Sequence, residues 1–176
     1  QFQKIFKLNF LQQLSTFTVC GNFGDFVACP DALEIIKYVR QSNPNIRITI
    51  CTNGSARNID FWSQLAEYRP EVSFCIDGLE DTHTLYRLDT NWNHIIRNAQ
   101  AFISAGGDAV WKMIKFQHNE HQVDQCRAMA ADLGFIKFDL TDHSRSNGSV
   151  FDRQGNLTHQ IGSGPGHAST DTVIKW

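Results

Sequence analysis

The sequence predicts an α/β protein: a partial (β/α) barrel with a curved parallel sheet and helices on the outside. Apolar runs of strand length alternate with helix-like segments, and strand starts recur every roughly 26 to 37 residues, which is the spacing of βαβ units. Four of these runs end in a short polar or glycine-rich cluster. Right-handed crossovers place all helices on one side of such a sheet and bring the strand carboxyl ends to one rim.

The first half of the chain contains three predicted strands. Thr16 to Cys20 is rich in β-branched and aromatic residues and ends at glycine, after a short helix expected within residues 6–14. Pro30 opens the next helix, where Asp31 and Glu34 have capping-box spacing. The strands at 46–51 and 72–76 flank a helix around 61–68, and the second of them is apolar enough to be covered on both faces.

The second half repeats the same rhythm. A helix is expected from Trp92 to Ala105, stopped by Gly106 and Gly107, followed by a strand over 109–116. Asn119 is placed as the cap of a helix over 119–133, and 135–140 forms the fifth strand. Further predicted features are a hairpin of 150–151 with 157–161 around Gln154-Gly155-Asn156 and a short strand at 173–176. Residues 1–141 are therefore read as the barrel and 142–176 as a loop-rich extension.

Composition bounds the function. A chain of 176 residues with 41% hydrophobic content suits one globular core, and a net charge of -2 with a pI near 6.4 offers no basic stripe for nucleic acid. No run approaches the ~20 apolar residues of a membrane span, and the first residues lack the charged, apolar and small-residue order of a signal peptide. We expect a soluble, cytoplasmic protein with no membrane or nucleic-acid partner.

The cysteines and histidines give little indication of a metal site. The five cysteines are widely spaced with no CxxC pair, and Cys51 and Cys75 are expected as small buried residues inside strands. His118 and His121 have a spacing that can hold a metal on one helical face, but no HExxH accompanies them. We expect a structural or surface role for both and assign no metal ligand.

Polar clusters follow the first four strands at the predicted rim. They are Gly21-Asn22-Phe23-Gly24-Asp25, Thr52-Asn53-Gly54, Asp77-Gly78 and His118-Asn119. Carbonyls and a carboxylate at the first cluster can receive an ammonium group, while the hydroxyl, amide and carboxylate of the next two can bind a sugar or another polar ligand. Each cluster is also ordinary turn chemistry when taken alone.

The order of these clusters resembles the core of a radical S-adenosylmethionine enzyme, over about Phe17 to Leu140. The matching pieces are CGNFGD, TNG, FCIDG followed by Thr82-His83 and Tyr86-Arg87, and FQHNEHQ. The resemblance implies an S-adenosylmethionine site. Its implied members are Gly21, Asn22, Gly24 and Asp25 at the ammonium group, Thr52 and Asn53 nearby, Asp77 at the ribose, Arg87 at the carboxylate, and Asn119 and Leu140 at the ribose and adenine. No catalytic residue is implied.

One family feature is missing. The CxxxCxxC loop that binds three irons of the [4Fe-4S] cluster occurs nowhere in the chain, and the chain starts at Gln1 instead of methionine. We therefore expect a truncated part of a longer radical enzyme, inactive alone, with the cluster ligands elsewhere. The alternatives are a barrel-type metal-dependent hydrolase using the histidines and Asp77, or a non-catalytic binding module. The substrate stays open among peptides, nucleosides and metabolites.

Truncation has a structural consequence. The strand at 16–20 would form a sheet edge with unpaired backbone groups, because its missing neighbour should lie alongside. We expect self-association through this edge, or cover of the edge by residues 1–14.

Overall fold

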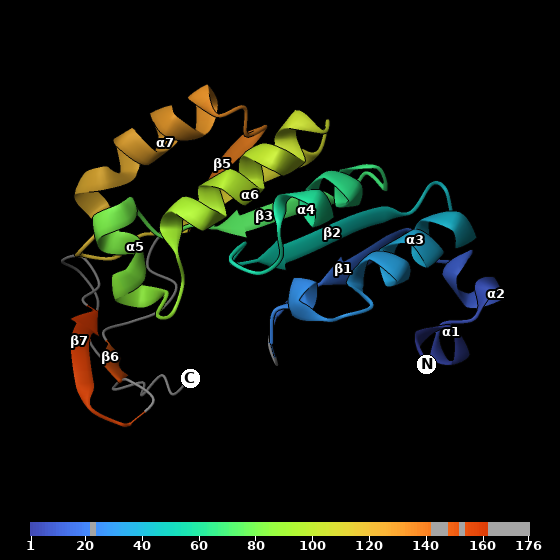
Figure 1. The fold of residues 1–176 in the computed structure, drawn as a ribbon, viewed down its shortest axis with the longest axis horizontal. Helices are drawn as coiled ribbons and strands as arrows, with labels where there is room; N and C mark the ends of the chain where they lie inside the picture. Colours follow the sequence, from blue (N-terminus) through green and yellow to red (C-terminus); the bar gives the residue numbers. More distant parts are fainter. Residues whose placement is uncertain (22–23, 142–147, 152–153, 162–176) are drawn as a thin grey trace.

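Five parallel strands form the centre of the computed structural model, which describes residues 1–21, 24–141, 148–151 and 154–161 (Figure 1). The strands are β1 (Thr16–Val19), β2 (Arg47–Thr52), β3 (Glu71–Cys75), β4 (Asp108–Ile114) and β5 (Lys137–Thr141). They lie in the order β1-β2-β3-β4-β5, and each is parallel to its neighbour. A sheet that grows in one direction has the winding of a barrel, whereas a doubly wound sheet reverses its strand order. The predicted fold class is confirmed.

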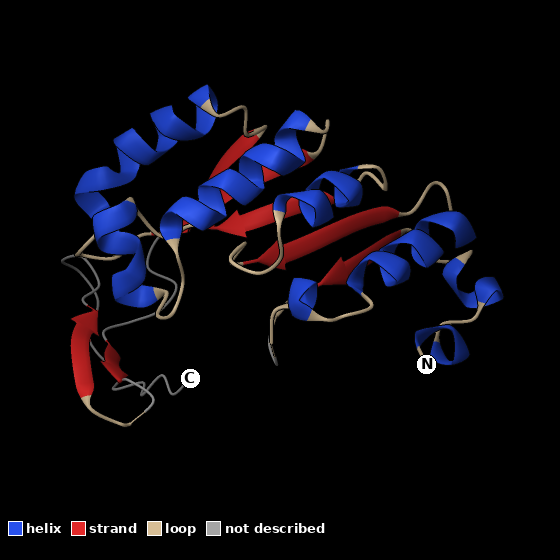
Figure 2. Cartoon of the chain, viewed as in Figure 1, coloured by secondary structure: helices blue, strands red, loops and turns tan. Residues whose placement is uncertain are grey.

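Four helices pack against one face of this sheet (Figure 2). They are α3 (Ala32–Ser42), α4 (Ile59–Ala66), α6 (Trp92–Ser104) and α7 (Val123–Asp132). Strand side chains alternate between faces, so every second residue enters this layer, as Ile50, Phe74 and Trp111 do. The Phe74 ring lies 5.0 Å from Trp62 of α4 and 6.1 Å from Phe102 of α6. This apolar layer holds the strands in register and so fixes where their carboxyl ends lie.

The face of the sheet turned away from these helices, called the opposite face below, carries polar side chains. Its polar members alternate with the core residues and include Thr16, Thr18, Arg47, Thr49, Cys51, Glu71, Ser73, Cys75, Lys112, Lys137 and Asp139. The apolar Val110 and Ile114 lie on the same face, because the register pairs Val110 with Ser73 and Lys137, and Ile114 with Thr141. The expectation of buried cysteines is wrong here, since Cys51 and Cys75 are only half-buried. Helices cover one face alone, and the period of two puts both thiols on the other.

Helix ends follow the sequence signals at several positions. Asn58 and Asn91 cap α4 and α6, each accepting a hydrogen bond from a backbone N–H three residues on. Gly106 and Gly134 have positive φ, as expected after α6 and α7. The Asp31 side chain makes no cap hydrogen bond to α3, so that prediction is wrong. Its backbone is in a turn (φ -91, ψ 10) and lacks the extended conformation of a capping residue.

Two helical elements differ from prediction around the rim. The structure adds α5 (Glu80–Tyr86), a short helix directly after β3 that no apolar periodicity announced. The helix predicted from Asn119 begins as α7 at Val123, after the single turn η2 (Glu120–Gln122). Asn119 makes no side-chain cap, because its amide is engaged with the strand ends described below.

The N-terminal residues form two short helices, α1 (Phe2–Ile5) and α2 (Leu8–Leu11), in place of one. Phe2 and Phe6 stack on each other, and both meet the Phe17 ring of β1 edge-on. They cover the helix side of β1. Within the described residues, the hydrogen-bonding edge of β1 away from β2 carries no strand.

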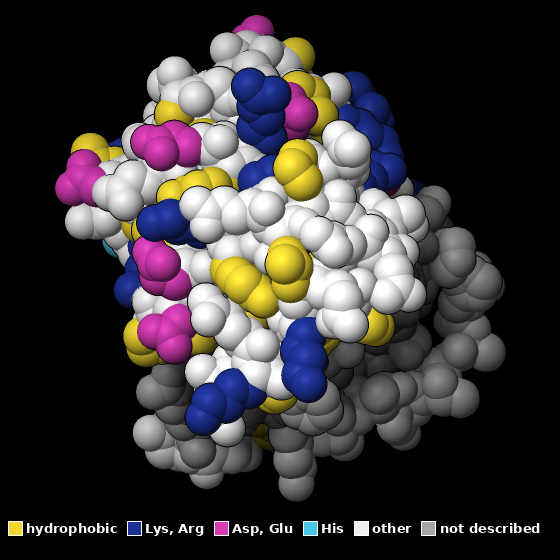
Figure 3. Space-filling model, turned by 90° about the vertical axis from the view of Figure 1, so that its right-hand side faces the viewer, with side chains coloured by type: hydrophobic (Ala, Val, Ile, Leu, Met, Phe, Trp, Pro, Cys, Tyr) yellow, Lys and Arg dark blue, Asp and Glu magenta, His cyan; other side chains and the backbone are white. Residues whose placement is uncertain are grey.

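The surface around α1 and α2 shows apolar side chains in small groups between charged ones (Figure 3). Ile5, Leu8 and Phe10 are the large exposed hydrophobic residues of these helices. At the other end, β6 (Gly148–Phe151) and β7 (Leu157–Ile161) form the predicted antiparallel hairpin. The strand predicted at 173–176 lies outside the described residues.

Candidate functional site

A carboxylate ties the end of β1 to the end of β2. Asp25, in the loop after β1, accepts hydrogen bonds from Thr52 Oγ1 and from the Asn53 backbone N–H, both at 2.8 Å. It also accepts from the Val27 N–H and so caps the short turn η1 (Phe26–Ala28). We call this arrangement the β1–β2 bridge. The sequence placed Asp25, Thr52 and Asn53 at one rim, and the structure brings them into contact.

The bridge commits some groups and leaves others open. Thr52 is buried, donating to Asp25 and accepting from the Gly54 N–H. The oxygen Oδ1 of Asn53 accepts from Ser55, while its Nδ2 has no hydrogen-bond partner among the described residues. Thr52 and Asp25 thus shape the rim, and Asn53 Nδ2 is a donor that the bridge leaves uncommitted among the described residues.

Glycine is required where the rim backbone passes close to other atoms. Gly54 has φ +73, and a Cβ there would lie 2.7 Å from Cδ1 of Phe74. A Cβ on Gly21 would lie 2.9 Å from the Gly24 carbonyl oxygen, so the loop after β1 folds tightly on itself. Of the predicted ammonium site, Gly21 and Gly24 are exposed, and Asn22 lies outside the described residues.

A second bridge joins the ends of β3 and β4. Asp77 is fully buried, with Oδ1 accepting from the Ile114 N–H at 2.7 Å and Oδ2 accepting from Arg87 Nε at 2.6 Å. Asn119 donates from Nδ2 to the carbonyls of Asp77 and Ile114, and accepts from the Phe116 N–H. We call this the β3–β4 bridge. Asp77 and Asn119 are therefore committed to protein groups, and their predicted ribose contacts stay predictions.

Arg87 is the group that the β3–β4 bridge orients. Its side chain is 20% exposed and lies 5.0 Å from the Tyr86 ring centroid. Burial works against the charged form, but the Asp77 carboxylate, with Cys75 and Tyr86 adding to its effect, raises the pKa of Arg87 above its usual value. Nη1 and Nη2 have no hydrogen-bond partner among the described residues. A permanent positive charge with two open, parallel donors suits a carboxylate or phosphate.

His83 supports the β3–β4 bridge, a role that the sequence did not assign to it. Its Nδ1 accepts the Asp77 N–H at 3.1 Å, so the proton of the neutral ring sits on Nε2, which is buried and has no partner among the described residues. Burial lowers the pKa of His83 to about 4, partly opposed by Asp77. A neutral, fully buried imidazole here has a structural role.

Asn98 plays the corresponding part beneath the β1–β2 bridge. Asn98 lies in the middle of α6 and is fully buried. Its Nδ2 donates a hydrogen bond of 2.9 Å to the Gly54 carbonyl. The sequence could have indicated this role, because Asn98 is a polar residue within the apolar stripe formed by Ile95, Ala99 and Phe102. It fixes the loop that presents Asn53.

Leu140 and the histidine pair lie apart from these groups. Leu140 packs against the helix-side core, and its predicted approach to adenine stays a prediction. His118 stacks on Phe116 with ring centroids 5.3 Å apart. Among the described residues, no three His, Cys, Asp or Glu side chains are arranged to hold a metal ion, which gives the hydrolase alternative no support.

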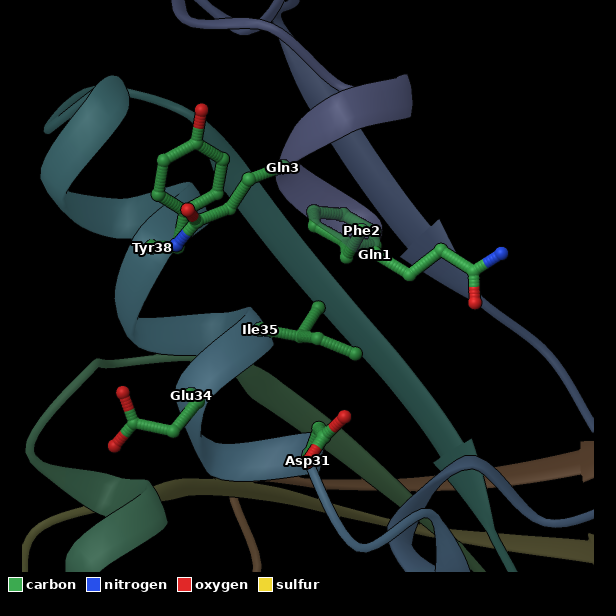
Figure 4. Close-up of a pocket in the computed structure, with 7 residues that line it drawn as sticks. All are labelled: Gln1, Phe2, Gln3, Asp31, Glu34, Ile35 and Tyr38. Carbon is green, nitrogen blue, oxygen red and sulfur yellow. The ribbon is translucent and has the colours of Figure 1, made fainter.

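A small cavity occurs elsewhere, between the N-terminus and α3 (Figure 4). Its volume is about 120 Å³, and its lining residues are Gln1, Phe2, Gln3, Asp31, Glu34, Ile35 and Tyr38. None belongs to either bridge.

In the described part of the chain, no helix is long and apolar enough to cross a membrane.

The fold and the two bridges define a barrel-type α/β protein with a polar rim at the strand carboxyl ends. Solved structures share this fold. They include Streptococcus suis SuiB bound to S-adenosylmethionine, with a TM-score of 0.63 at 14% identity over 74% of this chain and 30% of that chain. Another is anSMEcpe with bound AdoMet, with a TM-score of 0.59 at 16% identity over 79% of this chain and 40% of that one.

A third neighbour is the radical S-adenosylmethionine methyltransferase TsrM from Kitasatospora setae, solved with cobalamin and a [4Fe-4S] cluster. Its TM-score is 0.57 at 12% identity, over 90% of this chain and 43% of that one. The chain has the fold of the radical S-adenosylmethionine core, as predicted, and spans less than half the length of each neighbour. No protein-family model and no curated protein sequence matches it.

Proposed function

We propose that this chain binds S-adenosylmethionine at the rim formed by the two bridges, as the cofactor-binding part of a radical S-adenosylmethionine enzyme. The observation that carries the proposal is Arg87, held by buried Asp77 with two guanidinium nitrogens open. Two solved structures of the same fold contain this cofactor. Their sequence identity is low, so the residues of this chain must supply the argument.

The two charged groups of the cofactor's amino-acid part each have a matching group. The Arg87 fork takes the carboxylate by paired charge-assisted hydrogen bonds. Exposed backbone carbonyls of the Gly21 and Gly24 loop take the ammonium group, and Asn53 Nδ2 donates to a neighbouring oxygen. Asp25, Asp77 and Asn119 act as positioning residues, because their oxygens and nitrogens are occupied by the bridges.

The [4Fe-4S] cluster does not fit the residues present. The chain contains no CxxxCxxC motif, and no described group of three or more ligating side chains could hold a metal. When bound, such a cluster supplies the electron that cleaves S-adenosylmethionine. We assign no step of that cleavage to these residues, and the proposal for this chain is restricted to binding.

The substrate proposal rests on the opposite face of the sheet. Barrel interiors are commonly filled by bulky apolar side chains, whereas this face presents Thr49, Ser73 and Lys112 beside the apolar Val110 and Ile114. Polar walls favour a polar substrate beside the cofactor. The solved structures include SuiB bound to its precursor peptide SuiA and anSMEcpe with a Cp18Cys peptide, which favours a peptide among the classes left open.

Equilibrium dialysis with S-adenosylmethionine tests the proposal. We expect saturable binding that Arg87→Met weakens by about tenfold or more, since a charged hydrogen bond contributes roughly 1.5 to 3 kcal/mol. Methylthioadenosine lacks the carboxylate, so its binding should not depend on Arg87. Arg87→Lys keeps the positive charge opposite Asp77 but removes the paired guanidinium donors, so it separates the effect of the paired hydrogen bonds from that of the charge. Absence of saturable binding, or equal weakening of both ligands, would contradict the proposal.

A further inference from the structure

Two thiols face each other across β1 and β2 on the opposite face of the sheet. Val19 pairs with Ile50 in the parallel register, so the next residues along each strand, Cys20 and Cys51, are neighbours. The Cys20 thiol is also close enough to Cys51 to help raise the pKa of the Cys51 thiol. Cys75 lies further from this pair, because the register partner of Cys51 on β3 is Ser73.

Strand geometry allows a bond between these sulfurs. Adjacent strands are about 4.8 Å apart, and disulfides span Cα separations of about 4.4 to 6.8 Å. Both side chains leave the sheet on the same face, as the alternation along β1 and β2 requires. Cys20 is exposed, whereas Cys51 is half-buried. A reagent in solution can therefore reach the pair through Cys20.

We propose that Cys20 and Cys51 form a reversible dithiol site that small-molecule disulfides, such as oxidised glutathione, convert to an intramolecular disulfide. This site is independent of the proposed cofactor. The bond would tie β1, an edge strand among the described residues, to β2 directly beside the β1–β2 bridge.

The chemistry balances in two exchange steps. The Cys20 thiolate attacks one sulfur of oxidised glutathione, the external S–S bond breaks, and one glutathione thiolate leaves. The Cys51 thiolate then attacks the Cys20 sulfur of the mixed disulfide and expels the second glutathione. The protein loses two hydrogen atoms, and both glutathione molecules leave reduced. Burial raises the pKa of Cys51, with Cys20 adding to the shift and Lys112 opposing it, which makes Cys20 the first nucleophile.

Peptide mapping of the unmodified chain tests the inference without any variant. The protein is equilibrated with defined ratios of oxidised to reduced glutathione, quenched with an alkylating reagent, digested and analysed by mass spectrometry. We expect a peptide pair joined through Cys20 and Cys51, reversed by added reduced glutathione. A stable glutathione adduct on Cys20 with no such pair, or a Cys51–Cys75 linkage, would overturn the proposal.

Thermal unfolding gives a second readout. A cross-link that closes the chain between β1 and β2 restricts the unfolded ensemble, so the oxidised protein should unfold at a higher temperature than the reduced one. Cys51→Ser should lose both the linkage and this shift. Cys75→Ser, on the same face, should retain both. If peptide mapping shows the Cys20–Cys51 disulfide to be fully formed and the thermal unfolding midpoint is nevertheless unchanged, the proposed cross-link between β1 and β2 is contradicted.

Discussion

Arg87 Nε donates to Asp77 Oδ2 over 2.6 Å, and the carboxylate that accepts is completely buried. The two residues are ten positions apart and α5 lies between them, so this ion pair fixes a short helix against the end of β3. It also holds a guanidinium at the rim with its two outer nitrogens open. The stability of the fold and the proposed ligand site therefore share one pair of residues.

Removing the carboxylate should be costly. Asp77→Ala leaves the buried Arg87 charge and the Ile114 N–H unpaired, and breaking a buried ion pair in this way costs about 3 to 5 kcal/mol. Urea unfolding of variant and parent measures the difference. As a matched control, Glu71→Ala breaks the exposed pair with Arg47, which should cost less than about 1 kcal/mol. Equal losses for the two variants would show that burial of the Asp77 pair has no energetic weight.

His83 should make the fold sensitive to acid. Its pKa is about 4 in the folded chain against an ordinary value of 6.5, so between these values the unfolded state binds more protons. The stabilisation is complete above pH 6.5 and is lost as the pH falls toward 4, by about 3 kcal/mol in all. His83→Asn keeps an acceptor near the Asp77 N–H and cannot titrate.

Urea midpoints between pH 4 and 7 measure this effect. The difference in stability between the parent and His83→Asn should change steadily across that range. His121→Asn, at an exposed position, should follow the parent throughout. A parallel pH dependence for the parent and His83→Asn would rule out His83 as the group responsible.

Gly54 should tolerate no side chain. Gly54→Ala combines a positive φ with a Cβ 2.7 Å from Phe74, whereas Gly106→Ala has a positive φ and no atom within 4 Å. The control should lose about 1 kcal/mol from backbone strain alone, and Gly54→Ala about 1 to 3 kcal/mol more from overpacking. Thermal or urea unfolding compares the two. Equal losses would mean that Phe74 moves aside freely.

The edge of β1 away from β2 carries no strand among the described residues, so we predict self-association through it. Phe2 and Phe6 of the N-terminal residues contact the helix side of β1. Light scattering should show a mass that rises with concentration, and Thr18→Lys should reduce it, because a lysine on an edge strand opposes pairing. Gln12→Lys adds the same charge at an exposed position outside the strand. A monomeric parent at all concentrations would refute the prediction.

Local sequence signals predicted much of the fold. Each strand lies within a few residues of its predicted range, because apolar runs bounded by glycine and asparagine mark both the core and its interruptions. Gly106 follows α6 as predicted, because a helix end depends on near neighbours in the chain. The caps at Asn58 and Asn91 were not predicted, although they too are local.

Long-range contacts account for the differences. The Asn119 amide is occupied by the ends of β3 and β4, so it does not cap a helix, and α5 is held by the Asp77–Arg87 pair. Asp77 was expected to face a ligand, yet its oxygens meet Ile114 and Arg87. Asp77 lies 37 positions from Ile114 and 42 from Asn119, so no local window of sequence contains these partners.

The sequence by itself determined the order of strands, the helices between them and the gathering of polar loops at one rim, because hydrophobic period and turn chemistry act over short spans. Only the tertiary structure decided which polar groups form hydrogen bonds within the two bridges. It also decided which groups, such as Nη1 and Nη2 of Arg87, have no hydrogen-bond partner among the described residues. It also decided that Cys20 and Cys51 meet. Hydrogen-bond satisfaction and strand register are properties of the assembled sheet, in which residues distant in the chain compete for the same few donors and acceptors.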